Sequence, residues 1–264
     1  MCNATGIAFG ERMLTKDVVA GRDVLEVGAY DVNGSIRPHA ESLAPRSYIG
    51  VDIAEGPRVD RVLDATRLIE TFGRESFDVV VTTEMVEHVR DWRTVMANLK
   101  GVLRPGGHLL VTTRSAGFPY HGWPYDFWRY EPEDMRRIFA DLELIAVESD
   151  TASPGIFVFG RRPEVFTEST PDLALMSIVT GRRQRRVTNA QIAWFRATSL
   201  LDPIVAAAKS RGSGVVRAVR RRRIRPERGW ATFRRRVVSP VWRSLPRPLR
   251  TGVKRALGRP EAAR

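Results

Sequence analysis

Two strand-like runs near the start of the chain end in residues that could bind a ligand. The apolar run VLEV at 24–27 leads to Gly28, and the polar turn after it reaches Gly34 before a helix-like segment. Because glycine has no Cβ, a ligand can approach its backbone closely at the end of a strand. A second run, YIGV at 48–51, ends in Asp52, where an acid can accept hydrogen bonds from ribose hydroxyls. The two ends together predict one site for a nucleotide-bearing cofactor.

Three further strand-like runs follow, and two of them also end in acids. The run RVDRVL at 58–63 leads to Asp64, and FDVVVTT at 77–83 leads to Glu84. The segment LRPGGHLLVTT at 103–113 places a Pro-Gly-Gly turn before another strand. Strands that alternate with helix-like segments are typical of an α/β fold with a parallel sheet.

Taken in order, the EVGxxxxNG turn, the FDVVVxxEMVEHV run and the LRPGG turn resemble class I S-adenosylmethionine-dependent methyltransferases over roughly residues 20–162. The resemblance implies a Rossmann-like, doubly wound sheet of seven mainly parallel strands with helices on both faces. A nicotinamide-binding Rossmann domain shares the strand-end glycine and acid. It lacks the LRPGG turn, however, and would be expected to carry GxGxxG, which is absent from this chain.

The same resemblance implies S-adenosylmethionine as the cofactor. Glu26 would orient water or the amino group of its methionine moiety, Asp52 would hold the ribose, and Ile53 would pack on the adenine. The other expected cofactor contacts are Gly28, Ala29, Tyr30, Asp64, Ala65, Thr83 and Glu84. Two of these have structural alternatives, since Asp64 could cap the following turn and Tyr30 could pack on the first helix.

The segment RSAGFPYHGWPYDFWRY at 114–130 is expected to wall the acceptor pocket. Aromatic rings suit the apolar face of a sugar, and a few polar side chains can fix its hydroxyls. The expected substrate contacts are Tyr120, Trp123, Phe127, Trp128 and Arg129. This segment also resembles bacterial methyltransferases of cell-surface glycan pathways. Alternatively, the aromatics form a small core beneath a long loop, with an Asp126–Arg129 ion pair.

A hydroxyl acceptor would benefit from a general base, and the candidate catalytic residues are His121, His88 and Asp126. His121 lies in the aromatic loop near Asp126, whereas His88 would share a helical face with Glu84. His121 is favoured, because a Glu-His pair after the fourth strand is common in the family whatever the acceptor. No group of His, Asp and Glu has the spacing of metal ligands, so the sequence predicts no metal.

Charge divides the chain into two parts. Its 264 residues, 43% of them hydrophobic, are enough for one α/β domain and an extension. Residues 182–264 hold 24 Lys and Arg against 3 Asp and Glu, a net charge of +21 against +13 for the whole chain.

We expect a cofactor-binding domain at 1–163, a linker at 164–187, and a basic, mainly helical and partly disordered tail at 188–264. The single cysteine excludes an internal disulfide.

Arginine runs at 220–223 and 234–236 alternate with apolar residues, including Trp230 and Trp242. Clustered arginines suit either nucleic acid or an anionic membrane. The interleaved apolar residues favour the membrane, because an interfacial helix buries an apolar face. With no signal-peptide or membrane-spanning pattern, we expect a cytoplasmic protein with peripheral membrane contact through 212–250. The alternatives are a tail that packs on the acidic domain or stays disordered.

Three functions are compatible with these patterns. The first is O-methylation of a sugar or glycan intermediate, which could be lipid-linked, with a small-molecule natural product as another acceptor. The second is methylation of RNA or another nucleic acid, which is disfavoured because the catalytic half is acidic and has no Asn-Pro-Pro-Tyr-type motif. The third is a binding module that has lost the chemistry, which the intact acids at 26, 52 and 64 disfavour. No oligomeric state follows from the sequence.

Overall fold

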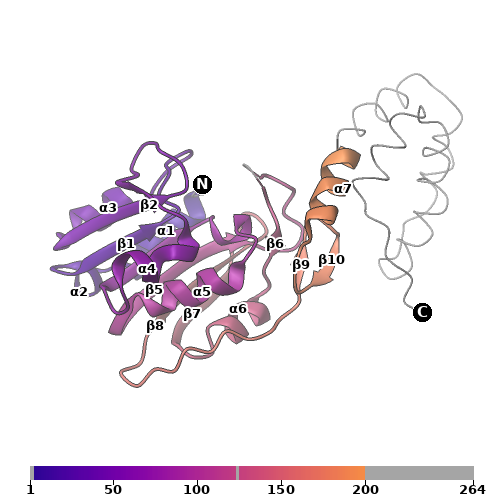
Figure 1. Cartoon of the computed structure of the whole chain (residues 1–264). Coiled ribbons are helices and arrows are strands. Elements are labelled where there is room, and N and C mark those ends of the chain that lie inside the picture. The colour runs from indigo at the N-terminus through magenta and orange to yellow at the C-terminus, as the bar shows by residue number, and fades with distance from the viewer. Residues whose placement is uncertain (1–2, 123–124, 200–264) are drawn as a thin grey trace, which may run out of the picture. The chain divides into compact units, whose positions relative to one another are not determined.

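The computed structural model describes residues 3–122 and 125–199, and the chain divides into two compact units, Met1–Val187 and Thr188–Arg264 (Figure 1). In the second unit, the described residues form helix α7 (Asn189–Ser199). Among the residues that the structure describes, no helix has the length and hydropathy needed to cross a bilayer. Trp123 and the expected membrane-binding segment 212–250 lie outside the described residues.

The first unit is built on a seven-stranded sheet in the order β3-β2-β1-β4-β5-β8-β7. The strands are β1 (Asp23–Val27), β2 (Ser47–Asp52), β3 (Arg61–Val62), β4 (Phe77–Thr83), β5 (Leu103–Arg114), β7 (Glu143–Ser149) and β8 (Gly155–Arg161). The first five are parallel neighbours, and β8 runs antiparallel to both β5 and β7. The mainly parallel, doubly wound sheet expected from the sequence is confirmed.

Helices connect the strands and cover the sheet. They are α1 (Ala4–Met13), α2 (Lys16–Val19), α3 (Arg37–Ser42), α4 (Leu68–Phe72), α5 (Trp92–Gly101) and α6 (Pro132–Ile138), with 3-10 turns η1 (Ala65–Arg67) and η2 (Val86–His88). Right-handed crossovers place α3 and α5 on opposite faces, because the strand order reverses between β1 and β4.

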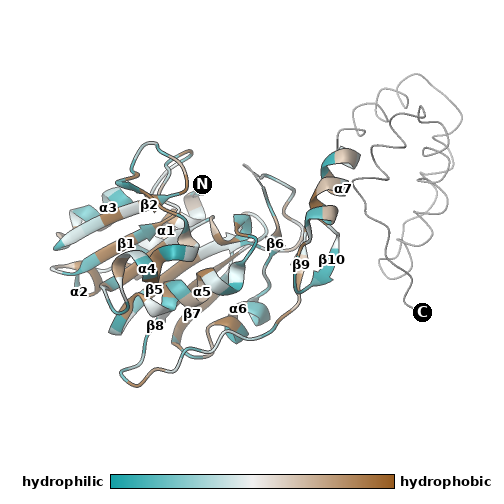
Figure 2. Ribbon diagram, viewed as in Figure 1, coloured by the Kyte–Doolittle hydropathy of each residue, from teal (hydrophilic) through white to brown (hydrophobic). Residues whose placement is uncertain are grey.

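The middle of the central strands is apolar and buried, as in 79–81 of β4 and 109–111 of β5, because helices cover both faces of the sheet. Figure 2 shows this as brown colouring through the middle of the sheet. On one face, Phe9 of α1 and Ile36 pack with Val79 and Leu110 in the main core cluster. This packing fixes the strands, and therefore the positions of the polar residues at their carboxyl ends.

Residues 164–187, which the sequence analysis treats as a linker, carry two strands. β9 (Leu175–Ser177) pairs antiparallel with both β6 (Trp128–Arg129) and β10 (Arg182–Gln184). The fully buried Lys100 ammonium of α5 also lies 3.1 Å from the Glu168 carboxylate. This segment is therefore part of the first unit, because it pairs with β6 and gives a buried lysine an anionic partner.

Candidate active site

The turn after β1 brings the chain backbone to the carboxyl edge of the sheet. Gly28 has a φ of +84°, and the amides of Gly28 and Ala29 both donate to the Val51 carbonyl, at 2.9 and 3.0 Å. A Cβ at position 28 would lie 2.6 Å from the Cβ of Met85. Glycine is therefore required here both by the backbone conformation and by the neighbouring chain after β4.

Asp52 ends β2 beside this turn and carries the polar group of the expected ribose site. Its carboxylate accepts from the Tyr30 amide at 3.3 Å and the Ala54 amide at 3.2 Å. Ile53 next to it is 61% exposed. Tyr30 lies against Gly56 rather than on the first helix. The acid and the apolar side chain are thus presented side by side at the sheet edge.

Glu26 and Asp64, two of the expected cofactor residues, differ in how their carboxylates are buried and hydrogen-bonded. Glu26 is buried and accepts a hydrogen bond from the Tyr48 hydroxyl at 2.9 Å; burial raises its pKa to about 7. Asp64 is exposed, and its Oδ1 accepts from the Thr66 amide at 2.8 Å, so it caps η1 as the structural alternative proposed. Ala65 is buried directly behind this cap.

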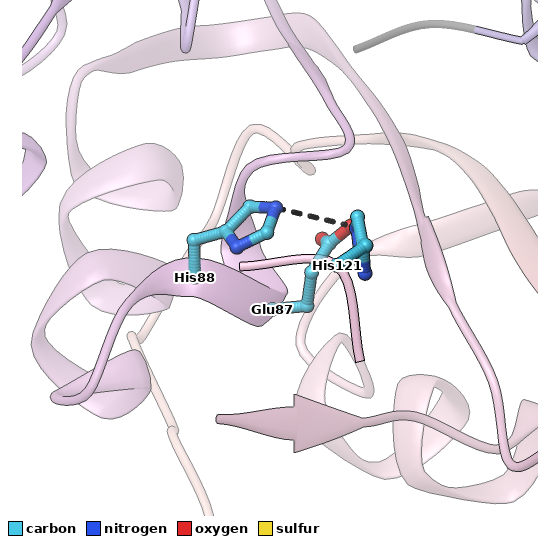
Figure 3. A group of neighbouring side chains, drawn as sticks. All are labelled: Glu87, His88 and His121. Atoms are coloured by element: carbon cyan, nitrogen blue, oxygen red, sulfur yellow. Dashed lines mark ion pairs between the residues drawn. The ribbon is translucent and has the colours of Figure 1, made fainter. Parts of the chain in front are cut away.

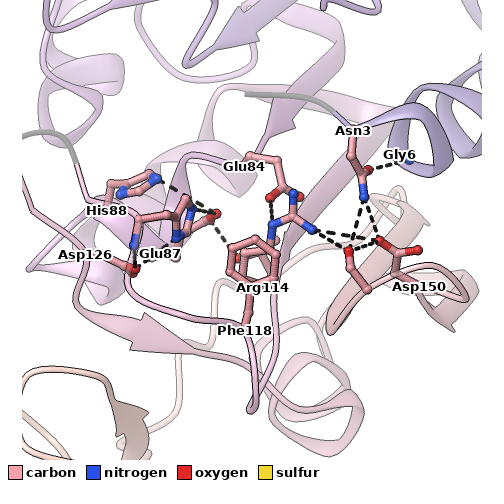
Figure 4. A network of polar contacts seen from close by, with 12 residues as sticks. Asn3, Gly6, Glu84, Glu87, His88, Arg114, Phe118, Asp126 and Asp150 are labelled. Atoms are coloured by element: carbon pink, nitrogen blue, oxygen red, sulfur yellow. Dashed lines mark hydrogen bonds and ion pairs between the residues drawn. The ribbon is translucent and has the colours of Figure 1, made fainter. Parts of the chain in front are cut away.

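Glu84 follows β4 and is held in a network that Figure 4 shows from close by. Its backbone is left-handed, with a φ of +54°, and its buried carboxylate contacts the Arg114 guanidinium. Arg114 also donates to the Ser153 hydroxyl at 3.0 Å and lies over the Phe118 ring. Burial, followed by the charge of Glu87, raises the pKa of Glu84. Thr83 is buried next to it.

A second polar group lies at the same edge and joins residues far apart in the sequence. Glu87 and His88 belong to η2, and His121 comes from the loop after β5 (Figure 3). Glu87 Oε1 lies 3.6 Å from His121 Nε2 and 4.0 Å from His88 Nε2, while Glu87 Oε2 accepts from the Thr113 hydroxyl at 2.8 Å. The structure therefore brings together both histidines named as catalytic candidates, with Glu87 between them.

Asp126, the third catalytic candidate, holds His121 in place. Its carboxylate lies 2.9 Å from His121 Nδ1 and accepts two hydrogen bonds of 2.6 Å from Arg129. Burial opposes a charge on His121, yet Asp126 and Glu87 together raise its pKa to about 9. Burial likewise opposes ionisation of Asp126, but Arg129 and His121 lower its pKa to about 2. Asp126 is fully buried and therefore acts as a positioning residue.

The aromatic loop, residues 114–130, exposes fewer aromatic side chains than its composition suggests. Phe127, Trp128 and Arg129 are buried, and the Trp128 indole donates to the Val89 carbonyl at 2.9 Å. These three side chains form the small core beneath the loop that was the alternative to substrate contact. Tyr120, by contrast, is 42% exposed. Composition alone could not separate the inward rings from the outward one.

Sequence reasoning missed Glu87 as a member of the site. It is the one fully buried carboxylate in the EMVEHV run, and both histidines face it. An available signal was the second acid three residues after Glu84, in the run that follows the fourth strand; Glu84 itself lies before η2, with a left-handed backbone. The partner His121 gave no such signal, because it is distant along the sequence.

Comparison with known proteins identifies the family. Residues 7–146, more than half of the chain, match a family described as a methyltransferase domain. The chain belongs to this methyltransferase family. The methyltransferase is thus a transferase, and the expected resemblance to class I S-adenosylmethionine-dependent enzymes is confirmed. Its cofactor is S-adenosylmethionine, and the residues fit that cofactor, since Asp52 and Ile53 present an acid and an exposed apolar side chain beside the tight glycine turn at Gly28.

Several relatives are ubiquinone biosynthesis O-methyltransferases. The protein from Pseudomonas putida is 32% identical over 109 residues, which cover 36% of this methyltransferase and 45% of the relative. The protein from Sinorhizobium medicae is 39% identical over 95 residues, covering 35% and 33%. This methyltransferase thus spans less than half the length of these relatives.

Solved structures of methyltransferases also align with it. A Burkholderia thailandensis 1,6-didemethyltoxoflavin-N1-methyltransferase has a TM-score of 0.46 and 17% identity, covering 60% of this chain and 78% of that one. An S-adenosylmethionine-dependent methyltransferase from Mesorhizobium loti has a TM-score of 0.47 and 17% identity, covering 61% and 99%.

Gly28→Ala is expected to weaken binding of S-adenosylhomocysteine more than about 10-fold, because the added methyl meets both strain and the Met85 side chain. Gly21→Ala is the matched control, since Gly21 also has a positive φ of +68° but nothing lies within 4 Å of its Cβ position. It should lose roughly 1 kcal/mol of stability and keep its affinity. Isothermal titration calorimetry measures both affinities, and equal losses would contradict a close approach at Gly28.

The affinity for S-adenosylhomocysteine is expected to rise as the pH approaches about 7 and to level off above it. The reason is that the ligand's ammonium group favours the charged form of Glu26, which burial makes scarce at lower pH. Glu26→Gln should flatten this pH dependence, whereas the exposed Glu11→Gln should not. Calorimetry over a pH series tests this, and an unchanged pH profile in Glu26→Gln would assign the dependence to another group.

Proposed function

We propose that this methyltransferase O-methylates a hydroxyl acceptor. The observation that carries the proposal is the convergence of Glu87, His88 and His121 beside the carboxyl ends of β4 and β5. Such groups help an acceptor that has to lose a proton, whereas an amine needs little more than alignment. Its relatives named above are O-methyltransferases, which supports the same choice of atom.

The chain's own residues would perform three tasks. Bound S-adenosylmethionine supplies an electrophilic methyl group. Asp52 and Glu26 would hold its ribose and amino ends, which sets the direction of the methyl group. His121, held by Asp126 and protonated at neutral pH because its pKa is about 9, would stabilise the negative charge that develops on the acceptor oxygen, and the neighbouring His88 would take up the hydroxyl proton. The loop that carries His121 would limit the access of water.

We infer that the acceptor is a sugar or glycan intermediate. The support is the exposed ring of Tyr120 on the loop that carries His121, because such a ring can stack on a sugar face. Phe127 and Trp128 are buried and do not add to this argument. The names of the relatives favour a second acceptor class, an intermediate of ubiquinone biosynthesis.

Labelled methyl from S-adenosylmethionine is expected to enter a sugar-containing fraction of a lysate from the source cells. The lysate is separated into lipid, soluble-sugar, polysaccharide, protein and nucleic-acid fractions after incubation with the purified protein. A methyl ether would be stable to mild alkali and released by hydriodic acid, unlike a carboxyl ester. Asp52→Ala should abolish the label, because it removes the ribose-binding acid.

The exposed Asp17→Ala of α2 is the matched control and should leave the label unchanged. Alkali-labile label would contradict O-methylation of a hydroxyl. Label in quinone lipids would keep the reaction and replace the sugar by the second acceptor class. Label sensitive to nuclease would favour nucleic-acid methylation.

We further propose that the protein is cytoplasmic and contacts anionic membranes through 212–250. The support is the alternation of arginine runs with apolar residues in the sequence. The full chain should sediment with vesicles of phosphatidylcholine and phosphatidylglycerol and not with phosphatidylcholine alone. Replacing the four arginines at 220–223 by glutamine should weaken this binding. Stronger binding to RNA than to anionic vesicles would overturn the membrane assignment.

A further inference from the structure

We propose that Glu87, His88 and His121 bind a divalent transition-metal cation, to which the hydroxyl acceptor is then ligated. The proposed role in activating the hydroxyl rests on the proposed function, but the binding of the cation does not. The proposal replaces the sequence-based expectation of a metal-free site. That expectation considered spacing along the chain, and the third ligand comes from a different loop.

The three ligand atoms are close enough to share one cation. Glu87 Oε1, His88 Nε2 and His121 Nε2 all lie within 4.8 Å of one another, and two of the separations are 3.6 and 4.0 Å. Zinc held at about 2.1 Å by tetrahedral ligands sets those ligands about 3.4 Å apart. Binding therefore requires the atoms to close in by an ångström or so, which side-chain rotation can supply.

In each of the three side chains, the ring nitrogen or carboxylate oxygen that points away from the proposed cation already contacts another polar group. Metal ligands in proteins usually have such contacts. The Nδ1 atom of His88 lies 2.7 Å from the Tyr125 carbonyl oxygen, and that of His121 lies 2.9 Å from the Asp126 carboxylate. Glu87 Oε2 accepts from the Thr113 hydroxyl. With Nδ1 donating to the Tyr125 carbonyl, His88 presents the lone pair of Nε2 toward Glu87 Oε1, and His121 would do the same once the cation displaces its Nε2 proton.

The atoms that face the cation position lack other hydrogen-bond partners. Within the described residues, Glu87 Oε1 and both ring nitrogens of His121 are buried and make ion-pair contacts but no hydrogen bond of acceptable geometry. The nearby arginines form ion pairs with other acids, Arg129 with Asp126 and Arg114 with Glu84. The two histidines compensate the charge on Glu87 Oε1 only at 3.6 and 4.0 Å, and a shared cation would bind this oxygen directly.

The ligand set indicates the kind of cation and what it would do. Two imidazoles and one carboxylate suit zinc or a similar first-row metal, and three protein ligands leave a position open for another oxygen. A hydroxyl bound there loses its proton more readily. The acceptor O–H bond breaks and its proton passes to solvent. The new O–C bond then forms as the S–C bond breaks, leaving a neutral thioether.

Titration with Co²⁺ tests the site in the full chain after treatment with a chelator. We expect one Co²⁺ per chain, a visible absorption band from nitrogen and oxygen ligation, and displacement by Zn²⁺. His88→Gln and His121→Gln should each weaken Co²⁺ binding by more than about 100-fold. His39→Gln, on α3 and outside the cluster, is the matched control and should bind as the wild type does. Equal Co²⁺ affinity in wild type and His121→Gln would overturn the proposal.

Two further readouts separate this inference from the proposed function. Affinity for S-adenosylhomocysteine, measured without metal, should be the same in wild type and His121→Gln, which also shows that the variant folds. If the protein binds the metal but forms no methyl ether, the cation site is supported and the proposed O-methylation is contradicted. If methyl-ether formation is undiminished in the presence of a chelator, the cation has no role in the reaction and the proposed O-methylation is supported.

Discussion

The carboxylate of Glu87 lies where water does not reach it, and the chain around it is arranged to compensate its charge. Thr113 approaches from β5, His88 from the same turn, and His121 from a loop that returns to the end of β4. The amide of Phe127 also donates to the Glu87 carbonyl at 2.9 Å. Because an uncompensated buried charge costs several kcal/mol, the path of the loop is constrained by this one residue.

The same constraint explains the second buried acid of the loop. Asp126 neutralises Arg129 and orients His121, so it links the charge on Glu87 to the packing of β6. β6 in turn pairs with β9, which brings residues 164–187 into the first unit. The acceptor side of the site is therefore a continuous set of polar contacts supported by a small sheet, and it adjoins the cofactor side at Glu84.

The fold and the residues that end its strands could be predicted because their signals are local. An apolar run followed by Gly28 or Asp52 determines where a strand stops and what it presents there. The acceptor side could not be predicted in the same way. Whether Trp128 points inward depends on β9, and the proximity of His121 to Glu87 depends on the return of a loop. These are long-range contacts, which neither composition nor spacing reports.

Glu84 carries a consequence for the balance between stability and activity. At a φ of +54° an L-residue with a Cβ is strained by about 1 kcal/mol, and glycine would relieve that strain. Glycine would also remove the carboxylate that contacts the buried Arg114 guanidinium. Because breaking a buried ion pair costs several kcal/mol, more than the strain that glycine would relieve, stability and an intact site both favour glutamate here, and a stabilised variant of this enzyme is better sought among residues away from the end of β4.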